Sequence, residues 1–392
     1  MPIGRRPAAL AAFLTASALT FAACGGDDSA SDASSSTATT ATGDVSLAGV
    51  CPDPVVIQTD WMPESDHSES YALIGGTPKY DKSKKRVSGD LYYQGKPTGV
   101  QVEVRAGGPA TGFQTPTQQM YTDSSITLGY ENTDEAVRNS AKTPMLQVMA
   151  PREKWAQVLI FDPDTYDFKT IADVGKTDTK VLYFKGNYYM DYLIGAGILK
   201  KSQIDSSYDG TPARFVTSGG KVVQQGFITA EPWQYEHTVK QWMKPVATLS
   251  IADAGYPNYG EALAIKASQK SKLDACLKKL VPVIQQAQVD YAKDPTATNK
   301  IIVEAAKQYG GWDYPAGLAA FGAKAQVEQG IIASGSTPAL GDIDEERVQQ
   351  IIELTADIFK KQNVPVKDGL TPADIYTNEY IDQSISLDDS DS

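Results

Sequence analysis

Short apolar runs alternate with helix-like segments along this chain, and the alternation restricts the possible fold more than any other feature. Runs at residues 55–58, 100–105 and 158–161 have the length and apolar character of strands. Segments at 115–121 and 188–196 are predicted to be helical. Elements that alternate in this way predict α/β layers around largely parallel sheets.

The length of the apolar-rich part predicts two lobes. Hydrophobic residues make up 41% of the chain, and the roughly 340 residues after the first fifty exceed a single compact core. We expect lobe one to comprise residues 50–150 and 246–392, and lobe two to comprise residues 151–245. Two segments would then cross between the lobes as a hinge, with a ligand cleft between them.

The N-terminus has the three parts of a secretory signal. Two arginines supply positive charge, residues 7–23 form an apolar run too short to span a bilayer comfortably, and small residues end it. The sequence FAACG at residues 21–25 resembles a bacterial lipobox. This resemblance implies removal of a signal peptide (residues 1–23) and a lipid on Cys24. An ordinary cleaved signal with an unrelated cysteine is the alternative.

A low-complexity stretch follows the predicted lipidation site. Residues 24–49 are rich in Gly, Asp, Ser, Ala and Thr and contain no aromatic side chain. Such a segment buries too little apolar area to offset its ordering entropy, so we predict a flexible tether. The chain would then be exported and held by its lipid at the outer face of the cytoplasmic membrane.

Charge and cysteine usage narrow the chemistry further. The net charge is −12 and no basic cluster is long enough to bind nucleic acid, so a nucleic-acid partner is not expected. Beyond Cys24 the only cysteines are Cys51 and Cys276, which predicts one disulfide in an oxidising compartment. Two unrelated buried thiols are the alternative. With only His67 and His237, a zinc site of the usual type is not expected, and no metal or cofactor is predicted.

The sequence does not contain a complete match to the serine-nucleophile or phosphate-loop motifs. The chain contains no Gly-x-Ser-x-Gly elbow. Gly175-Lys176-Thr177 resembles the end of a phosphate loop, but Thr170 stands where the loop needs its first glycine. These observations do not require an enzyme, and we predict a non-enzymatic protein.

The segment after the first predicted strand carries a family resemblance. Residues 60–67 read DWMPESDH, which resembles the Asp/Asn-Trp-x-Pro-x-x-x-His signature of the thiamine-pyrimidine-precursor family, grouped with SsuA-like proteins. That family includes bacterial uptake binding proteins and fungal pyrimidine synthases, and it belongs with the nitrate, sulfonate and taurine binding proteins of ABC importers. Residues 224–233 and 377–380 also resemble its tracts. The resemblance implies a two-lobed periplasmic-binding-protein-like fold of type II.

The resemblance also implies a function. We expect a monomeric, lipid-anchored substrate-binding protein that delivers a small molecule, such as a thiamine-pyrimidine-like heterocycle, to an ABC importer permease. Nitrate, sulfonate, taurine or another small organic anion is the alternative ligand. A pyrimidine-synthase-like enzyme ranks third, because residues 255–265 lack the family enzyme's cysteines. Residues 75–99 form a charged insertion that departs from the family, so the ligand can differ too.

Candidate ligand-binding residues follow from strand ends. Trp61 offers a flat apolar face for stacking, and Asp60 can accept hydrogen bonds from a ring amine. Core packing for Trp61 and turn capping for Asp60 are the alternatives. Gly107 and Gly108 precede a turn whose backbone N–H groups can bind an anion, or form a plain tight turn. The other candidates lie at later strand or helix ends or, for His67, at a helix start, and are His67, Tyr130, Asn132, Thr133, Tyr188, Glu231, Trp233 and Tyr235.

Overall fold

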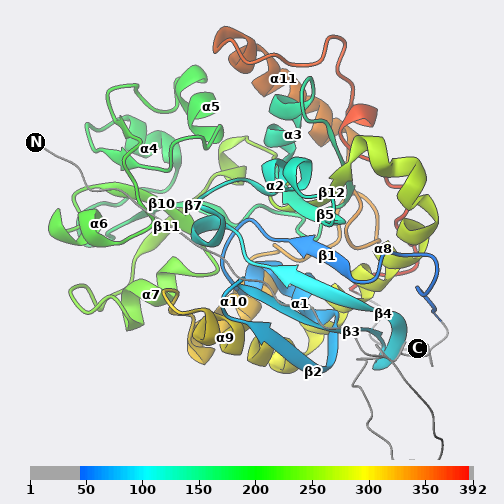
Figure 1. The fold of residues 1–392 in the computed structure, drawn as a ribbon. Coiled ribbons are helices and arrows are strands. Elements are labelled where there is room, and N and C mark those ends of the chain that lie inside the picture. Colours follow the sequence, from blue (N-terminus) through cyan, green and yellow to red (C-terminus); the bar gives the residue numbers. More distant parts are fainter. Residues whose placement is uncertain (1–44, 388–392) are drawn as a thin grey trace, which may run out of the picture. The chain divides into compact units, whose positions relative to one another are not determined.

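The computed structural model describes residues 45–387. The predicted signal peptide, Cys24 and most of the predicted tether lie outside the described residues. Two sheets, each flanked by helices, organise the described chain (Figure 1). The prediction of a two-lobed α/β fold is confirmed. In the described part of the chain, no helix combines the length and the apolar character needed to cross a membrane.

The first sheet has seven strands in the order β2-β3-β4-β1-β5-β12-β6. Strand β1 pairs in parallel with β4 and β5, whereas β12 runs antiparallel to β5 and β6. Its strands are β1 (Val55–Gln58), β2 (Ile74–Asp81), β3 (Arg86–Tyr93), β4 (Lys96–Arg105), β5 (Leu128–Glu131), β6 (Met145–Met149) and β12 (Ala262–Lys266).

The second sheet has five strands in the order β11-β7-β10-β8-β9. Strand β7 is antiparallel to β10 and β11, and β8 is parallel to β10 and β9. Its strands are β7 (Gln157–Phe161), β8 (Val181–Leu182), β9 (Ile204–Asp205), β10 (Val223–Phe227) and β11 (Ala247–Ser250).

Both sheets are mixed, so the prediction of largely parallel sheets is wrong. The insertion at residues 75–99 folds into the meander β2-β3-β4, and consecutive strands joined by short turns must run antiparallel. Strands β11 and β12 enter their sheets antiparallel to the neighbours they join. We predicted that the chain returns to lobe one at residue 246. The strand at that point, β11, instead pairs with β7 in the second sheet, so the chain returns to the first sheet only after β11.

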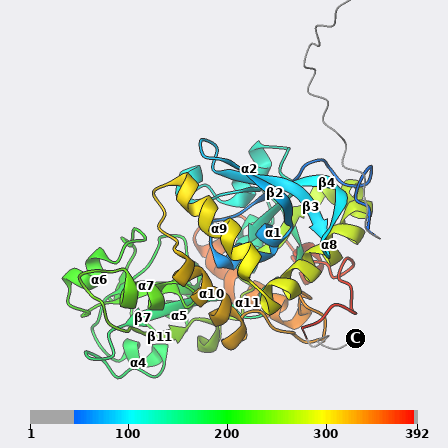
Figure 2. The same cartoon turned by 90° about the horizontal axis from the view of Figure 1, so that it is seen from below.

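Helices cover the faces of both sheets. In Figure 2, α8 and α9 lie beside β2 and β3, and α1 packs against both helices. Helix α3 begins after Asn132, and the Thr133 hydroxyl donates to the side chain of Gln147. The helices are α1 (Ser68–Ala72), α2 (Pro116–Thr122), α3 (Thr133–Asn139), α4 (Ile171–Gly175), α5 (Tyr189–Gly195), α6 (Ala213–Thr217), α7 (Glu231–His237), α8 (Lys270–Lys293), α9 (Thr296–Tyr309), α10 (Ala316–Glu328) and α11 (Glu345–Lys361).

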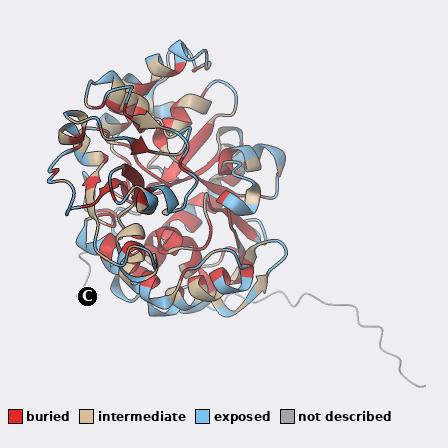
Figure 3. Ribbon diagram, turned by 90° about the vertical axis from the view of Figure 1, so that its left-hand side faces the viewer, coloured by how far each residue is buried: buried red, intermediate tan, exposed pale blue. Residues whose placement is uncertain are grey.

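Two segments connect the sheets, at residues 150–156 and 251–261. One large core lies between the first sheet and α8, α9 and α10, and a second joins the second sheet to α3, α5 and α11. Figure 3 shows the buried residues gathered on the strands and on the inner faces of the helices. Helix α11 contacts both α3 and α5, and its Arg347 donates to the carbonyls of Glu153 and Pro257, one in each crossing segment.

The start of the described chain is fixed to the first sheet. Cys51 and Cys276 form a disulfide, the pairing expected from the sequence. Leu47 is fully buried and its amide donates to Thr98, so the ordered chain begins earlier than the tether boundary predicted at residue 49. The Lys279 ammonium donates to the backbone of Ser46 on the same side.

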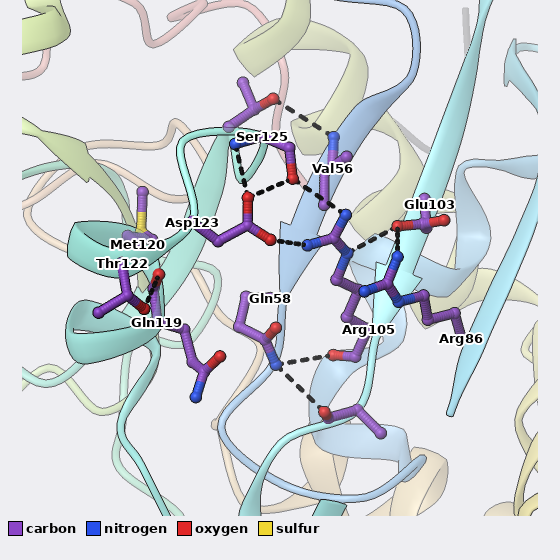
Figure 4. A network of polar contacts seen from close by, with 12 residues as sticks. Val56, Gln58, Arg86, Glu103, Arg105, Gln119, Met120, Thr122, Asp123 and Ser125 are labelled. Carbon is purple, nitrogen blue, oxygen red and sulfur yellow. Dashed lines mark hydrogen bonds and ion pairs between the residues drawn. The ribbon is translucent and has the colours of Figure 1, made fainter. Parts of the chain in front are cut away.

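A polar network holds the ends of β1 and β4, and the loops that follow these two strands lead to the candidate site. Arg105, at the end of β4, donates to Glu103 at 2.6 Å, to Asp123 at 2.8 Å and to Ser125 at 3.1 Å (Figure 4). The Gln58 side chain, at the end of β1, donates to the backbone carbonyls of Thr59, Arg105 and Ala106. The loops that follow β1 and β4 therefore start from rigid positions.

Candidate functional site

A cavity of about 710 Å³ lies between the two sheets and is lined from both sides. The first side supplies the loop after β1, from Asp60 to Glu64, and the second side supplies β10 and α7. The crossing segments add Trp155 and Glu261. A cavity of this size between two lobes is typical of a small-molecule site.

Trp61 forms an aromatic wall that touches both sides. Its ring lies 6.2 Å from that of Trp312 and 6.0 Å from that of Phe184, which follows β8 of the second sheet. A Cβ atom on Gly108 would lie 2.5 Å from the indole, and the Gly107 amide donates to the Trp61 carbonyl at 2.8 Å. The turn at Gly107 and Gly108 therefore packs against the indole ring of Trp61 and fixes its position.

Most of the charged side chains in the lining are carboxylates. The one cationic side chain among the lining residues is Lys240, which is exposed. A cleft lined by one sign of charge concentrates ligands of the opposite sign. Its five carboxylates are Asp60, Glu64, Glu231, Glu261 and Asp313.

Burial makes three of these carboxylates, Glu64, Glu231 and Glu261, costly to ionise. It raises the pKa of Glu231 to about 7. Burial also raises the pKa of Glu64 well above its usual range, and the neighbouring Asp66 raises it further. The pKa of Glu261 is raised well above its usual range by burial, although Arg152 opposes the rise. A bound cation would stabilise the ionised forms.

Arg152 is a fully buried cation behind this acidic wall. Its Nη2 lies 3.4 Å from Glu69 and its Nε lies 3.2 Å from Glu261. Burial lowers the pKa of Arg152, but Glu69 and Glu261 outweigh it and leave that pKa raised. One guanidinium is shared by two buried carboxylates, so it leaves the remaining acids of the cavity uncompensated.

The second side of the cavity presents hydrogen-bond acceptors. The Gln224 amide donates to the hydroxyl of Tyr235 at 3.1 Å, while its Oε1 is buried and has no hydrogen-bond partner among the described residues. The Gln157 amide donates to the Gly226 carbonyl and the Asn187 amide donates to Gln225. The side-chain N–H groups of Gln224, Gln157 and Asn187 therefore donate to other protein atoms. The Gln224 Oε1 atom remains available to accept a hydrogen bond from a ligand.

Five of the twelve predicted ligand-binding residues line the cavity. They come from the loop after β1, from the residue before α3, and from one face of α7. They are Asp60, Trp61, Asn132, Glu231 and Tyr235.

Four other predicted residues lie behind the lining, within the first-sheet side. His67 is buried, with its Nε2 2.7 Å from Asp60. Tyr130 is buried and donates to Glu69, because its side chain faces the core side of β5. Gly107 and Gly108 support the indole of Trp61 and do not present a free anion-binding turn toward the cavity.

Three further predicted residues also lie outside the lining. Thr133 is buried, and its backbone amide donates to the carbonyl of Tyr259. The Tyr188 ring packs against Phe359, at the side of the second core. Trp233 stacks on His237 and points away from the cavity, toward α10.

Several lining residues were not anticipated from the sequence. Glu64 lies inside the recognised DWMPESDH segment, so that segment carried a signal for it. Glu261 has a backbone φ of 59°, a rare conformation for a residue with a side chain, and this holds its carboxylate in the lining. Trp312 comes from the loop after α9, and no local sequence signal connects it to Trp61.

Comparison with known proteins supports the fold. No family model and no curated protein sequence matches the chain. Among solved structures, the periplasmic aliphatic sulphonate binding protein SsuA from Escherichia coli is 16% identical, with a TM-score of 0.53 over 82% of this chain and 91% of that one. A ligand-binding component of an ABC-type import system from Staphylococcus aureus, with zinc bound, is 11% identical, with a TM-score of 0.51 over 85% and 99%.

These similarities identify the fold as that of periplasmic substrate-binding proteins. Because a fold does not determine chemistry, the ligand has to be argued from the residues of the cavity.

Proposed function

We propose that this chain is the substrate-binding component of an ABC importer and closes its lobes around a small, amine-bearing or cationic heterocycle. The observation that carries the proposal is the cavity between the sheets, which combines five carboxylates with an aromatic wall. Aromatic faces stack on a heterocycle, and carboxylates accept hydrogen bonds from its ring nitrogens or amines.

Anionic ligands such as nitrate, sulfonate or taurine fit this cavity less well. They need buried donors or cations that face the ligand, and among the lining residues only the exposed Lys240 is cationic. Arg152 is already paired with Glu69 and Glu261. The acidic lining therefore favours the heterocycle suggested by the sequence over the anion alternatives.

The sequence supports a location outside the cytoplasm. A signal-like run followed by Cys24 supports export and lipid anchoring at the outer face of the membrane. An importer permease in that membrane is then the partner of the monomeric binding protein, and the fold shared with import components agrees with that role.

Calorimetry on the purified chain tests this proposal. We expect an aminopyrimidine or thiamine to bind, and nitrate and taurine to bind far more weakly. Trp61→Ala removes the stacking wall and should weaken binding by roughly 1–3 kcal/mol, about tenfold to a hundredfold. Trp233→Ala, a tryptophan outside the lining, is the matched control. Tight binding of the anions, or equal losses in both variants, would contradict the proposal.

A further inference from the structure

Three side chains able to bind a metal ion converge at the cavity wall, two of them in the lining and one, His67, directly behind it. Ligand atoms of Asp60, His67 and Glu261 all lie within 4.8 Å of one another. The three residues come from the loop after β1, from the turn that precedes α1, and from the second crossing segment. Their convergence is therefore a product of the tertiary fold and not of one local turn.

Two of these side chains are buried with unsatisfied polar atoms. His67 is fully buried, with its Nε2 facing Asp60, and its other ring nitrogen, Nδ1, has no hydrogen-bond partner in the described part of the chain. Glu261 is 3% exposed, and its Oε2 also lacks a hydrogen bond, although Arg152 Nε lies 3.2 Å away. The Asp60 side chain is 33% exposed and lines the cavity, so it connects the cluster to the entrance.

We propose that Asp60, His67 and Glu261 bind one divalent transition-metal ion and leave an open coordination position that faces the cavity. One imidazole nitrogen and two carboxylate oxygens are ligands that Zn²⁺ accepts, and three protein ligands with one exchangeable position form an open zinc site. Counting histidines and cysteines does not reveal this site, because carboxylates replace two of the usual ligands.

The charge of the surroundings favours a dication. Glu64 adds a third carboxylate to the lining beside the cluster, and the guanidinium of Arg152 is shared with Glu69. His67 Nε2 lies 2.7 Å from Asp60 Oδ1, a hydrogen bond whose proton a metal ion would replace.

This site does not depend on the proposed organic ligand. A metal ion and an amine would compete for the Asp60 and Glu261 carboxylates, and each can be measured without the other. Binding of zinc without binding of any amine would refute the proposed function alone. Binding of an amine without zinc would overturn the metal site alone.

Titration of the full-length chain with zinc chloride tests the inference. The chain is purified in a mild detergent, stripped with a chelator and followed by calorimetry and melting curves. We expect one ion per chain and a raised melting temperature. His67→Ala should weaken binding by about tenfold or more. His237→Ala removes the other histidine, which is exposed and stacked on Trp233, and should bind zinc like the wild type.

Removing the buried ring of His67 can also unfold the chain, so two nearly isosteric variants complete the test. Asp60→Asn and Glu261→Gln keep the side-chain shape and each removes one charged ligand. Both should melt as cooperatively as the wild type and bind zinc about tenfold or more weakly. Zinc binding unchanged in both variants, or absent from the wild type, would overturn the inference.

Discussion

Replacing Glu231 by Gln tests whether a half-buried carboxylate of α7 recognises a cationic ligand. Glu231 lines the cavity, and its Oε2 accepts a hydrogen bond from the Phe227 amide at 2.7 Å. A glutamine keeps the shape and can keep this hydrogen bond, but it removes the charge. The variant therefore separates the charge from the packing.

The pKa of Glu231 sets the expected magnitude. Burial raises it from 4.5 to about 7, and each unit corresponds to about 1.4 kcal/mol, so ionising Glu231 in the folded chain costs roughly 3 kcal/mol. Below pH 4.5 the group is protonated in both the folded and the unfolded chain. Between 4.5 and 7 the unfolded chain releases the proton first, so this group lowers the free energy of unfolding as the pH rises, with the full penalty above 7.

Without a ligand, Glu231→Gln should therefore be more stable than the wild type by up to roughly 3 kcal/mol at pH 8 and equally stable near pH 4. Urea unfolding at both pH values measures this difference. The affinity for a cationic ligand is measured with thiamine, because the positive charge of its thiazolium ring does not change with pH. The wild type should bind it more tightly as the pH rises through 7, and the variant should bind it more weakly at pH 8.

Glu236→Gln provides the control, because Glu236 is exposed on the same helix. It should change neither the pH profile of stability nor the affinity. The reasoning is refuted if Glu231→Gln shows a stability difference independent of pH, or if it binds thiamine at pH 8 as tightly as the wild type does.

Three further predictions concern the glycine turn, the disulfide and the anchor. Gly108 has a φ of 55°, and a Cβ atom there would lie 2.5 Å from Trp61, whereas Gly112 has a φ of 63° with open space around it. Gly108→Ala should therefore weaken ligand binding more than Gly112→Ala does. Equal binding and equal melting temperatures for the two variants would contradict the placement of Trp61. Free-thiol titration of the denatured, unreduced chain should detect neither Cys51 nor Cys276, and reduction should destabilise the fold by on the order of 2–5 kcal/mol; two reactive thiols would refute the bridge. Cys24→Ala should release the protein from membranes and abolish acyl labelling, whereas a soluble, unlabelled wild type would rule out the anchor.

The sequence was informative where chemistry follows from local pattern. The motif at residues 60–67 follows β1, and Asp60 and Trp61 reach the cavity because that strand ends at the cleft. In α7, Glu231 and Tyr235 are four residues apart and share one face, which lines the cavity. Trp233, two positions along, lies on another face, so helix geometry alone could have excluded it.

Strand directions and contacts between segments far apart in the sequence could not be predicted from local sequence patterns. Strand direction depends on where each crossing segment re-enters a sheet, and no local signal in β11 or β12 specifies that. Tyr130 and Thr133 lie near the correct strand end, but their partners, Glu69 and Tyr259, come from distant segments and draw them inward. Glu261 reaches the cavity through an unusual backbone conformation that residue type does not indicate.

The attachment of the first described residues determines where mechanical load enters the molecule. A pull on the chain ahead of residue 45 passes from Leu47 into β4 through a backbone hydrogen bond, and from Cys51 into α8 through the disulfide. Both elements belong to the first lobe, and the crossing segments at 150–156 and 251–261 lie off this path. Tension on the N-terminal end therefore enters through the first sheet and its helix α8, and not through the crossing segments.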